Sequence, residues 1–165
     1  LAGAASRAQR VEGMDPEWAE ELAYWAGGDR RHGLGVPDSA IPNQPPPTTV
    51  PDRDFGPTGT LPIWPGHDRE AVYAILYGDE DSALAWLRAG EALSAVWLDA
   101  ILHGLTVLPL SAAIEVPQTR QVLQGLLAGL GVPFLVLRIG VGDADHVGPP
   151  HTPRLPAEQT IEIVP

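Results

Sequence analysis

The segment from Trp86 to Ala112 constrains the fold more than any other part of the sequence, because it joins a long helix to a short apolar strand. Small and apolar residues recur at three- and four-residue steps between Ser82 and His103, which predicts a helix that Asp81 can cap. Gly104 ends this helix, and Leu105–Leu108 is predicted to form a strand. A helix that leads directly into a strand carries its last residues to one fixed place in the core.

Further regular elements are predicted on both sides of this segment. One helix starts at Asp15, followed by a proline that suits the first helical position, and ends at Gly27. Another helix starts at Pro117 and ends at Gly131. The remaining apolar or alternating runs predict strands over Ala71–Tyr77, Phe134–Ile139 and Thr160–Val164.

This order of elements indicates an α+β or an α/β fold with a thin central sheet flanked by helices, in three layers, and we expect the α+β class. We expect residues 1–165 to form a single domain. The stripe Trp86, Gly90, Leu93, Trp97 and the last strand leave more apolar surface and unpaired backbone than so thin a sheet can cover. We therefore expect pairing with a second subunit or with another half of the same protein. The first residue is Leu1 and the only methionine is Met14, so we expect a piece of a longer product.

A proline-rich stretch, residues 33–68, interrupts the regular elements. Its prolines lack a backbone donor, which disfavours a central strand or a long helix. A structureless segment of this length inside a domain is usually functional or disordered. Phe55, Ile63 and Trp64 could anchor it, so the sequence predicts either a surface loop that acts as a lid or a peripheral, partly disordered loop.

Charge and cysteine content limit the possible partners and location. Ten arginines and no lysine face 21 acidic residues, and the net charge of −11 disfavours nucleic acid and anionic membrane surfaces. No apolar run is long enough to span a bilayer. The absence of cysteine excludes disulfides and thiolate chemistry and is compatible with the cytoplasm, where we expect this protein.

The usual side-chain signatures of an acid–base enzyme are absent, so we predict no catalytic side chain and no metal ligand. Ser111 lacks the glycine-flanked elbow of a hydrolytic nucleophile. His146 and His151 lack the spacing of metal ligands, and His103 is expected to cap a helix C-terminus. Arg138 reads as an edge charge or an ion-pair partner rather than a ligand contact.

Two motifs carry a resemblance to a known family. The segment LDAILHGLTVLPLSA, residues 98–112, resembles the helix–Gly-Leu–strand–Pro element of the nitroreductases. The segment HTPRLP, residues 151–156, resembles their C-terminal basic motif, and the intervening helix and strand follow the family's order. The stretches DPEWAEELAYWAGGDRRHGLGVP and WLRAGEAL resemble the C-terminal half of actinobacterial oxidoreductases of the Acg type, in which two nitroreductase-like halves are fused.

The resemblance implies an FMN site in which the flavin supplies the reactivity. Pro109, Leu110, Ser111 and Ala112 would lie against the flavin ring, and Thr152 and Arg154 would contact the phosphate. Two features depart from the family's pattern. The N-terminal arginine motif has no match, and Ser111-Ala112 stands where many nitroreductases have Glu-Gly.

Each implied contact has a structural alternative. Pro109 and Leu110 could simply end a buried strand, and Arg154 could be a solvated surface arginine. At the level of function, the resemblance implies NAD(P)H-dependent reduction of a small acceptor at a flavin held between two halves or subunits. The alternatives are a flavin-binding protein without catalysis and a half-domain that does not contact a cofactor.

Overall fold

The computed structural model describes residues 1–27, 35–51, 54–56, 59–63, 68, 70–142 and 155–161. Its contacts divide the chain into two compact units. The first contains Leu1–Asp15, Pro47–Asp54 and Pro65–Val147, and the second contains Pro16–Pro46, Phe55–Trp64 and Gly148–Pro165. The organisation of residues 1–165 as a single domain stays a prediction.

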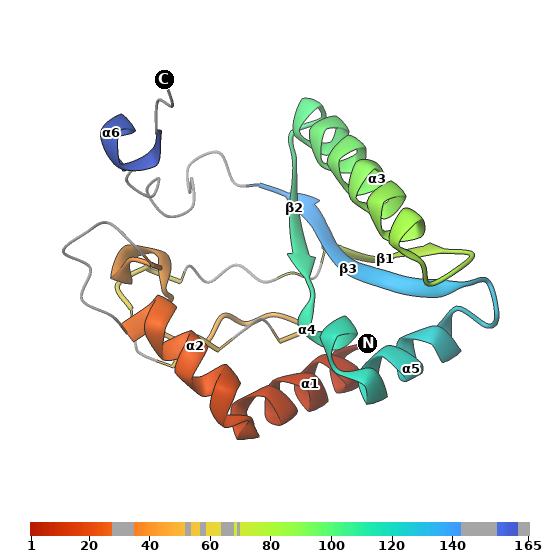
Figure 1. Cartoon of the computed structure of the whole chain (residues 1–165), viewed down its shortest axis with the longest axis horizontal. Helices are drawn as coiled ribbons and strands as arrows, with labels where there is room; N and C mark the ends of the chain where they lie inside the picture. The colour runs from red at the N-terminus through yellow and green to blue at the C-terminus, as the bar shows by residue number, and fades with distance from the viewer. Residues whose placement is uncertain are drawn as a thin grey trace. The chain divides into compact units, whose positions relative to one another are not determined.

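The first unit is built on a three-stranded antiparallel sheet (Figure 1). Its strands are β1 (Val72–Gly78), β2 (Leu105–Leu110) and β3 (Val132–Val141), in the order β1-β3-β2. The last of these three strands in the sequence is therefore the central one. Arg138 on β3 faces Tyr73 on β1 and Leu108 on β2, which fixes the register. The sheet is as thin as the sequence predicts.

One face of the sheet packs against α3 (Ala83–Leu102). Ala100 of this helix forms a buried cluster with Val107 of β2 and Leu137 of β3. The prediction that Asp81 caps the helix is wrong. Ser82 is the cap, and its side chain accepts a hydrogen bond from the N–H of Ala85 at 3.2 Å, the geometry that a serine at this position favours.

The opposite face carries α1 (Ala2–Met14), α4 (Ala112–Glu115) and α5 (Pro117–Leu126). Ala4, Ala113 and Leu123 from these helices form a second buried cluster with Val136 of β3. Because successive side chains of a strand point to opposite faces, Val136 and Leu137 belong to different clusters. Helices thus cover both faces of the sheet, and the α+β class with three layers is confirmed (Figure 1).

The second unit contains α2 (Pro16–Gly27), the 3-10 turn η2 (Asp38–Ala40) and α6 (Ala157–Thr160). The predicted strand over Thr160–Val164 is wrong at its first residue, because Thr160 ends α6. The helix begins after Pro156 with residues that favour a helical turn, and it extends into the start of the alternating pattern. Residues 162–165 lie outside the described part of the chain.

The proline-rich stretch has local structure where it is described. Pro42 and Leu61 form a parallel bridge, and the N–H of Asn43 donates to the carbonyl of Leu61 at 2.9 Å. Ile41 and Val50 are 2% and 4% exposed, so parts of this stretch are buried. Its role as a lid stays a prediction, and Trp64, one of the expected anchors, lies outside the described residues.

Candidate functional site

The turn between β2 and α4 contains the four residues that the sequence predicts to line a flavin ring. Pro109 and Leu110 are the last residues of β2, Ser111 is the cap position before α4, and Ala112 is the first residue of that helix. All four are half-buried. The strand is two residues longer than predicted, so Pro109 and Leu110 lie inside it. The structure brings the four residues together on one strand-to-helix turn.

This turn presents main-chain groups more than reactive side chains. Among the described strands, β2 pairs with β3 alone and is an edge of the sheet. Every second residue of such a strand directs its N–H and C=O away from the sheet. The side chain of Ser111 makes no capping hydrogen bond with α4. A planar ligand with hydrogen-bonding groups on its edge could therefore bind here without any particular side chain.

An apolar cleft of about 360 Å³ lies between the first half of α3 and the start of β3. β2 pairs with β3 only from Val136 onward, so Phe134 and Leu135 have no β2 residue beside them. The cleft is lined by Leu76, Trp86, Ala89, Gly90, Leu93, Ile114, Arg120, Phe134 and Leu135. Its volume lies within the range of small-molecule sites, and it is equally suited to side chains from another polypeptide.

Arg120 on α5 is the charged residue of this cleft, and its contacts are already made. Its Nη1 lies 2.9 Å from a carboxylate oxygen of Asp81, and its Nε–H donates to the carbonyl of Pro133 at 3.2 Å. The indole N–H of Trp86 donates to the other oxygen of Asp81 at 2.6 Å. The hydrogen bonds from Arg120 and Trp86 lower the pKa of Asp81. These contacts join α5, β3 and the start of α3.

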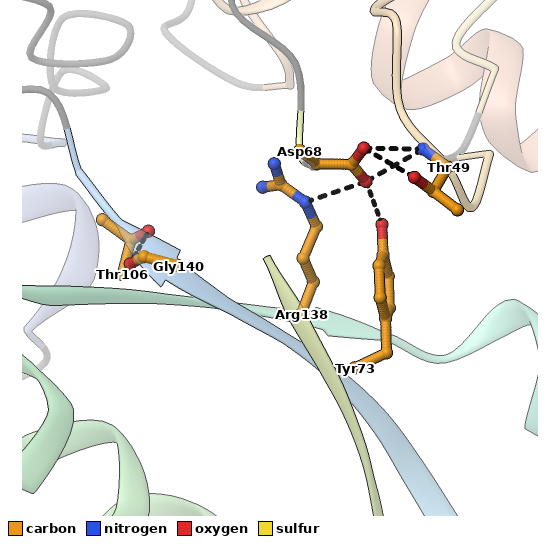
Figure 2. A network of polar contacts seen from close by, with 6 residues as sticks. All are labelled: Thr49, Asp68, Tyr73, Thr106, Arg138 and Gly140. Carbon is orange, nitrogen blue, oxygen red and sulfur yellow. Dashed lines mark hydrogen bonds and ion pairs between the residues drawn. The ribbon is translucent and has the colours of Figure 1, made fainter. Parts of the chain in front are cut away.

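A second polar network surrounds Asp68 and was not found by sequence reasoning (Figure 2). The N–H of Thr49 donates to both carboxylate oxygens of Asp68 at 2.9 Å, and the Thr49 hydroxyl donates to one of them at 2.8 Å. The Tyr73 hydroxyl donates to the same carboxylate. The Arg138 Nε lies 3.6 Å from it. The residues of this network are far apart in the sequence, and they form no sequence motif from which the network could be predicted.

The network keeps the Asp68 carboxylate ionised. Burial of this carboxyl, 2% exposed, would raise its pKa, but the hydrogen bonds from Tyr73 and Thr49 and the charge of Arg138 outweigh burial and lower the pKa to about 2. Burial and the hydrogen bond to Asp68 raise the pKa of Tyr73. At neutral pH the cluster therefore contains a carboxylate, a neutral phenol and a guanidinium. Arg138 is an ion-pair partner as expected, although it lies on the central strand rather than at an edge.

Other candidates from the sequence fall outside the described residues. They are Thr152 and Arg154, the implied phosphate contacts, and His146 and His151. Among the residues that the structure does describe, no group of three or more His, Asp or Glu side chains could hold a metal ion. His103 is the C-terminal cap of α3, and its Nδ1 lies 2.8 Å from the carbonyl of Asp99, in agreement with the expected capping role. In the described part of the chain, no helix has the length and apolarity to cross a bilayer.

The chain was compared with families and proteins that are already known. No family model matches the chain. Three proteins of Mycobacterium tuberculosis are similar to it. Rv3131, provisionally named an NAD(P)H nitroreductase, is 36% identical over an alignment of 154 positions that covers 90% of this chain and 44% of that protein. Acg, with the same provisional name, is 30% identical over an alignment of 166 positions that covers 99% of this chain and 50% of that protein. Rv3127, an uncharacterised protein, is 27% identical over 157 residues.

The chain thus spans about half the length of the curated relatives that it matches. The similarity covers nearly all of it, including the helix, strand and turn from α3 to α4. The three-layer α+β arrangement is compatible with half of a nitroreductase-like protein. Sequence similarity thus relates this chain, over 90% or more of its length, to about half the length of the Acg-type proteins that are named as nitroreductases.

Proposed function

We propose that the chain is one half of an FMN-binding oxidoreductase that uses NAD(P)H to reduce a small acceptor. The observation that carries this proposal is the similarity to proteins named as NAD(P)H nitroreductases over 90% or more of the chain. The β2–α4 turn supports it, because the segment that resembles the family's flavin-lining element forms one continuous, half-buried turn.

The residues at the turn fit a flavin ring. A flavin needs hydrogen bonds along its edge and one uncovered face, and the edge strand β2 with the following turn offers main-chain groups for the first need. Pro109 and Leu110 would support the ring, and the main chain of Ser111 and Ala112 would contact its edge. Arg154, with Thr152, would bind the phosphate. A local arginine is needed because the net charge of −11 opposes capture of an anion.

When bound, FMN would supply the hydride and electron transfer. This chain would bind and orient the ring, and it would exclude water from the side that the turn covers. No acid or base side chain lies among Pro109, Leu110, Ser111 and Ala112. In the proposed reaction NAD(P)H is oxidised and the small acceptor is reduced. Because the flavin would carry the electrons between them, the reaction requires no catalytic side chain at this turn.

The proposed partner of this half is a second subunit or the other half of a longer chain. The helix α3 has one buried residue, Ala100, whereas most of its large apolar side chains remain exposed: Leu84, Trp86, Leu87, Val96, Trp97, Leu98, Ile101 and Leu102. Gly90 has no atom within 4 Å of an added Cβ, so this point of the helix is open. We expect an interface of the obligate class, above roughly 2,000 Å² in total. A cytoplasmic location suits such a cysteine-free protein.

The test of the function is an absorption spectrum of the full-length protein, followed by anaerobic addition of NADPH. A yellow protein that bleaches on addition supports the oxidoreductase. A yellow protein that does not react with NADPH or NADH would contradict the enzymatic proposal and favour a flavin-binding protein. A colourless protein that does not take up added FMN would contradict both.

The test of the assembly is a substitution at the open point of α3. In the full-length protein, Gly90→Leu should lower thermal stability, because the added side chain would occupy space that the partner needs. Gly125→Leu is the matched control, since Gly125 on α5 also has no atom within 4 Å of an added Cβ. Equal effects of the two substitutions would contradict an interface at α3.

A further inference from the structure

The three strands contain one residue with a formal charge at neutral pH, Arg138. It lies on the central strand, in register with Tyr73 on one side and Leu108 on the other. A charge in the middle of a sheet costs desolvation free energy unless it is paired and hydrogen-bonded. Its contacts therefore indicate whether Arg138 is a structural residue or a binding residue.

Asp68 does not need Arg138 as a hydrogen-bond donor. Its two oxygens already accept hydrogen bonds from the N–H and hydroxyl of Thr49 and from the hydroxyl of Tyr73. The Arg138 Nε lies 3.6 Å from this carboxylate, which is an ion pair without hydrogen-bond geometry. This Nε is buried and has no hydrogen-bond partner. Structural arginine–carboxylate pairs are frequently bidentate, and the Arg138–Asp68 pair is not.

The end of the Arg138 side chain is directed away from the carboxylate. Figure 2 shows its two terminal nitrogens on the side of the guanidinium away from the Asp68 carboxylate, without a dashed contact to any residue drawn there. The side chain is 29% exposed, so a ligand can reach it. Arg120 is equally exposed, yet it donates to Pro133 and is paired with Asp81 at 2.9 Å. Arg138 lacks the corresponding contacts among the residues that the structure describes.

We propose that Arg138 is a binding residue for an oxyanion, a phosphate or carboxylate group, and that Asp68 is its positioning residue. The planar fork of a guanidinium matches both groups and binds them with two parallel hydrogen bonds. Asp68, fixed by Thr49 and Tyr73, restrains the guanidinium from the Nε side and leaves the terminal nitrogens for the ligand.

The location of Arg138 suggests the source of the oxyanion. Arg138 faces Leu108, the residue before Pro109, so it lies one strand away from the proposed flavin turn. The oxyanion would belong either to the phosphate of FMN or to an anionic acceptor. This choice rests on the proposed function, whereas the oxyanion site itself does not.

The first experiment uses inorganic phosphate as the probe and does not depend on flavin. Thermal unfolding of the full-length protein, freed of any cofactor, is compared in phosphate and in chloride at equal ionic strength. We expect phosphate to raise the melting temperature of the wild type more than that of Arg138→Gln. Arg120→Gln is the matched control, since it removes the same charge from an equally exposed arginine. An equal phosphate response in all three proteins would overturn the oxyanion site.

The second experiment separates the two sources by the dissociation constants of FMN and of riboflavin, which lacks the phosphate. If Arg138 binds the FMN phosphate, Arg138→Gln raises the dissociation constant of FMN about tenfold or more and leaves that of riboflavin unchanged. If it binds an acceptor, both flavins bind as before and KM rises for a carboxylate-bearing acceptor but not for a neutral one. Equal weakening of both flavins would show a structural role and overturn the proposal.

Arg138→Lys keeps the test informative if the glutamine variant does not fold. Lysine preserves the charge opposite Asp68 but lacks the fork, so its affinity for the oxyanion should lie between those of the wild type and the glutamine variant. Wild-type affinity in the lysine variant would contradict bidentate binding. A protein that binds phosphate through Arg138 but no flavin would retain the site and contradict the proposed function instead.

Discussion

The carboxylate of Asp81 lies 2.9 Å from the Nη1 of Arg120, across the opening between the start of α3 and α5. Arg120 also donates to the carbonyl of Pro133, so one side chain of α5 connects the start of α3 to the first residues of β3. These residues of β3 are not paired with β2. We expect Arg120→Met to lower the melting temperature, because the Pro133 carbonyl and Asp81 both lose a donor. Asp81→Asn, which retains an acceptor for Trp86, should lower it less. Equal effects would show that the Pro133 contact contributes nothing.

The Asp68 network predicts a specific loss of stability in acid. The folded pKa of about 2 is below the value near 3.9 expected for an unfolded chain, so the unfolded state binds the proton more readily. This contribution is complete above pH 4 and is lost as the pH falls through the folded value near 2. Asp68→Asn should cost about 2–4 kcal/mol at neutral pH, because Arg138 loses its counter-charge. Denaturant unfolding at several pH values measures both effects, and a wild-type pH profile in the variant would contradict the assignment.

Tyr73 provides the corresponding prediction in alkali. Its pKa is raised by burial and by the hydrogen bond to Asp68, so its contribution is present below the ordinary tyrosine pKa near 10 and is lost above it. The chain has three tyrosines. An absorbance titration of phenolate should contain one component that ionises above the ordinary tyrosine pKa. That late component should disappear in Tyr73→Phe, and its persistence would assign it to another residue.

Two glycines should respond to alanine in opposite directions. At Gly131 an added Cβ would lie 2.4 Å from the carbonyl oxygen of Gly78, a backbone atom that cannot move freely. Gly131→Ala should therefore destabilise the fold by about 2 kcal/mol or more. Gly125 lies in α5 with no atom within 4 Å of an added Cβ, and Gly125→Ala should stabilise by up to about 1 kcal/mol. Thermal unfolding of both variants checks the contrast, and a shared sign would contradict it.

Ser111 allows the proposed main-chain contact to flavin to be separated from a side-chain contact. Ser111→Ala keeps the N–H, so FMN affinity should not change. Ser111→Pro removes the N–H at a residue whose φ of −88° is near the proline range and whose predecessor is in a strand. FMN affinity should then fall about tenfold, the effect of one hydrogen bond. Affinity that changes in both variants would indicate a role for the hydroxyl.

The resemblance to the nitroreductases implies that Arg154 binds the FMN phosphate. Arg154→Ala in the full-length protein should weaken the binding of FMN about ten- to a hundredfold, since charge-assisted hydrogen bonds contribute around 1.5–3 kcal/mol. Fluorescence titration with FMN measures this change, and riboflavin serves as the control ligand. Unchanged affinity for FMN would show that the resemblance of residues 151–156 to the family's basic motif is accidental.

Local patterns were sufficient to predict the three strands of the sheet unit and its helices α3 and α5, because strand and helix periodicity is a local property. β1 was predicted one residue too early, and α3 one residue too long at each end. Two helices were missed for local reasons. α4 has only four residues, and α1, rich in alanine and polar residues, shows only a weak apolar stripe. The final predicted strand begins too early at Thr160, because a five-residue alternation does not show where the preceding helix ends.

The candidate site was predictable only in part. The turn from Pro109 to Ala112 could be located because its residues are consecutive and resemble a known motif. The Asp68 cluster could not, because it depends on a register in which Tyr73 meets Arg138, 65 positions later in the printed sequence. Nothing in the sequence around this aspartate, in a proline-rich stretch, predicts its hydrogen bond with the threonine 19 residues before it.

The strand order β1-β3-β2 has a consequence for how this sheet is completed during synthesis. The ribosome makes β1 and β2 first, and in this sheet neither pairs with the other. Both must wait for residues 132–141, so their apolar side chains and backbone edges are exposed in the nascent chain until then. Any chaperone that binds this region should therefore release it only after Val141 has left the exit tunnel. The last strand to be made is the one that converts two separate segments into a sheet.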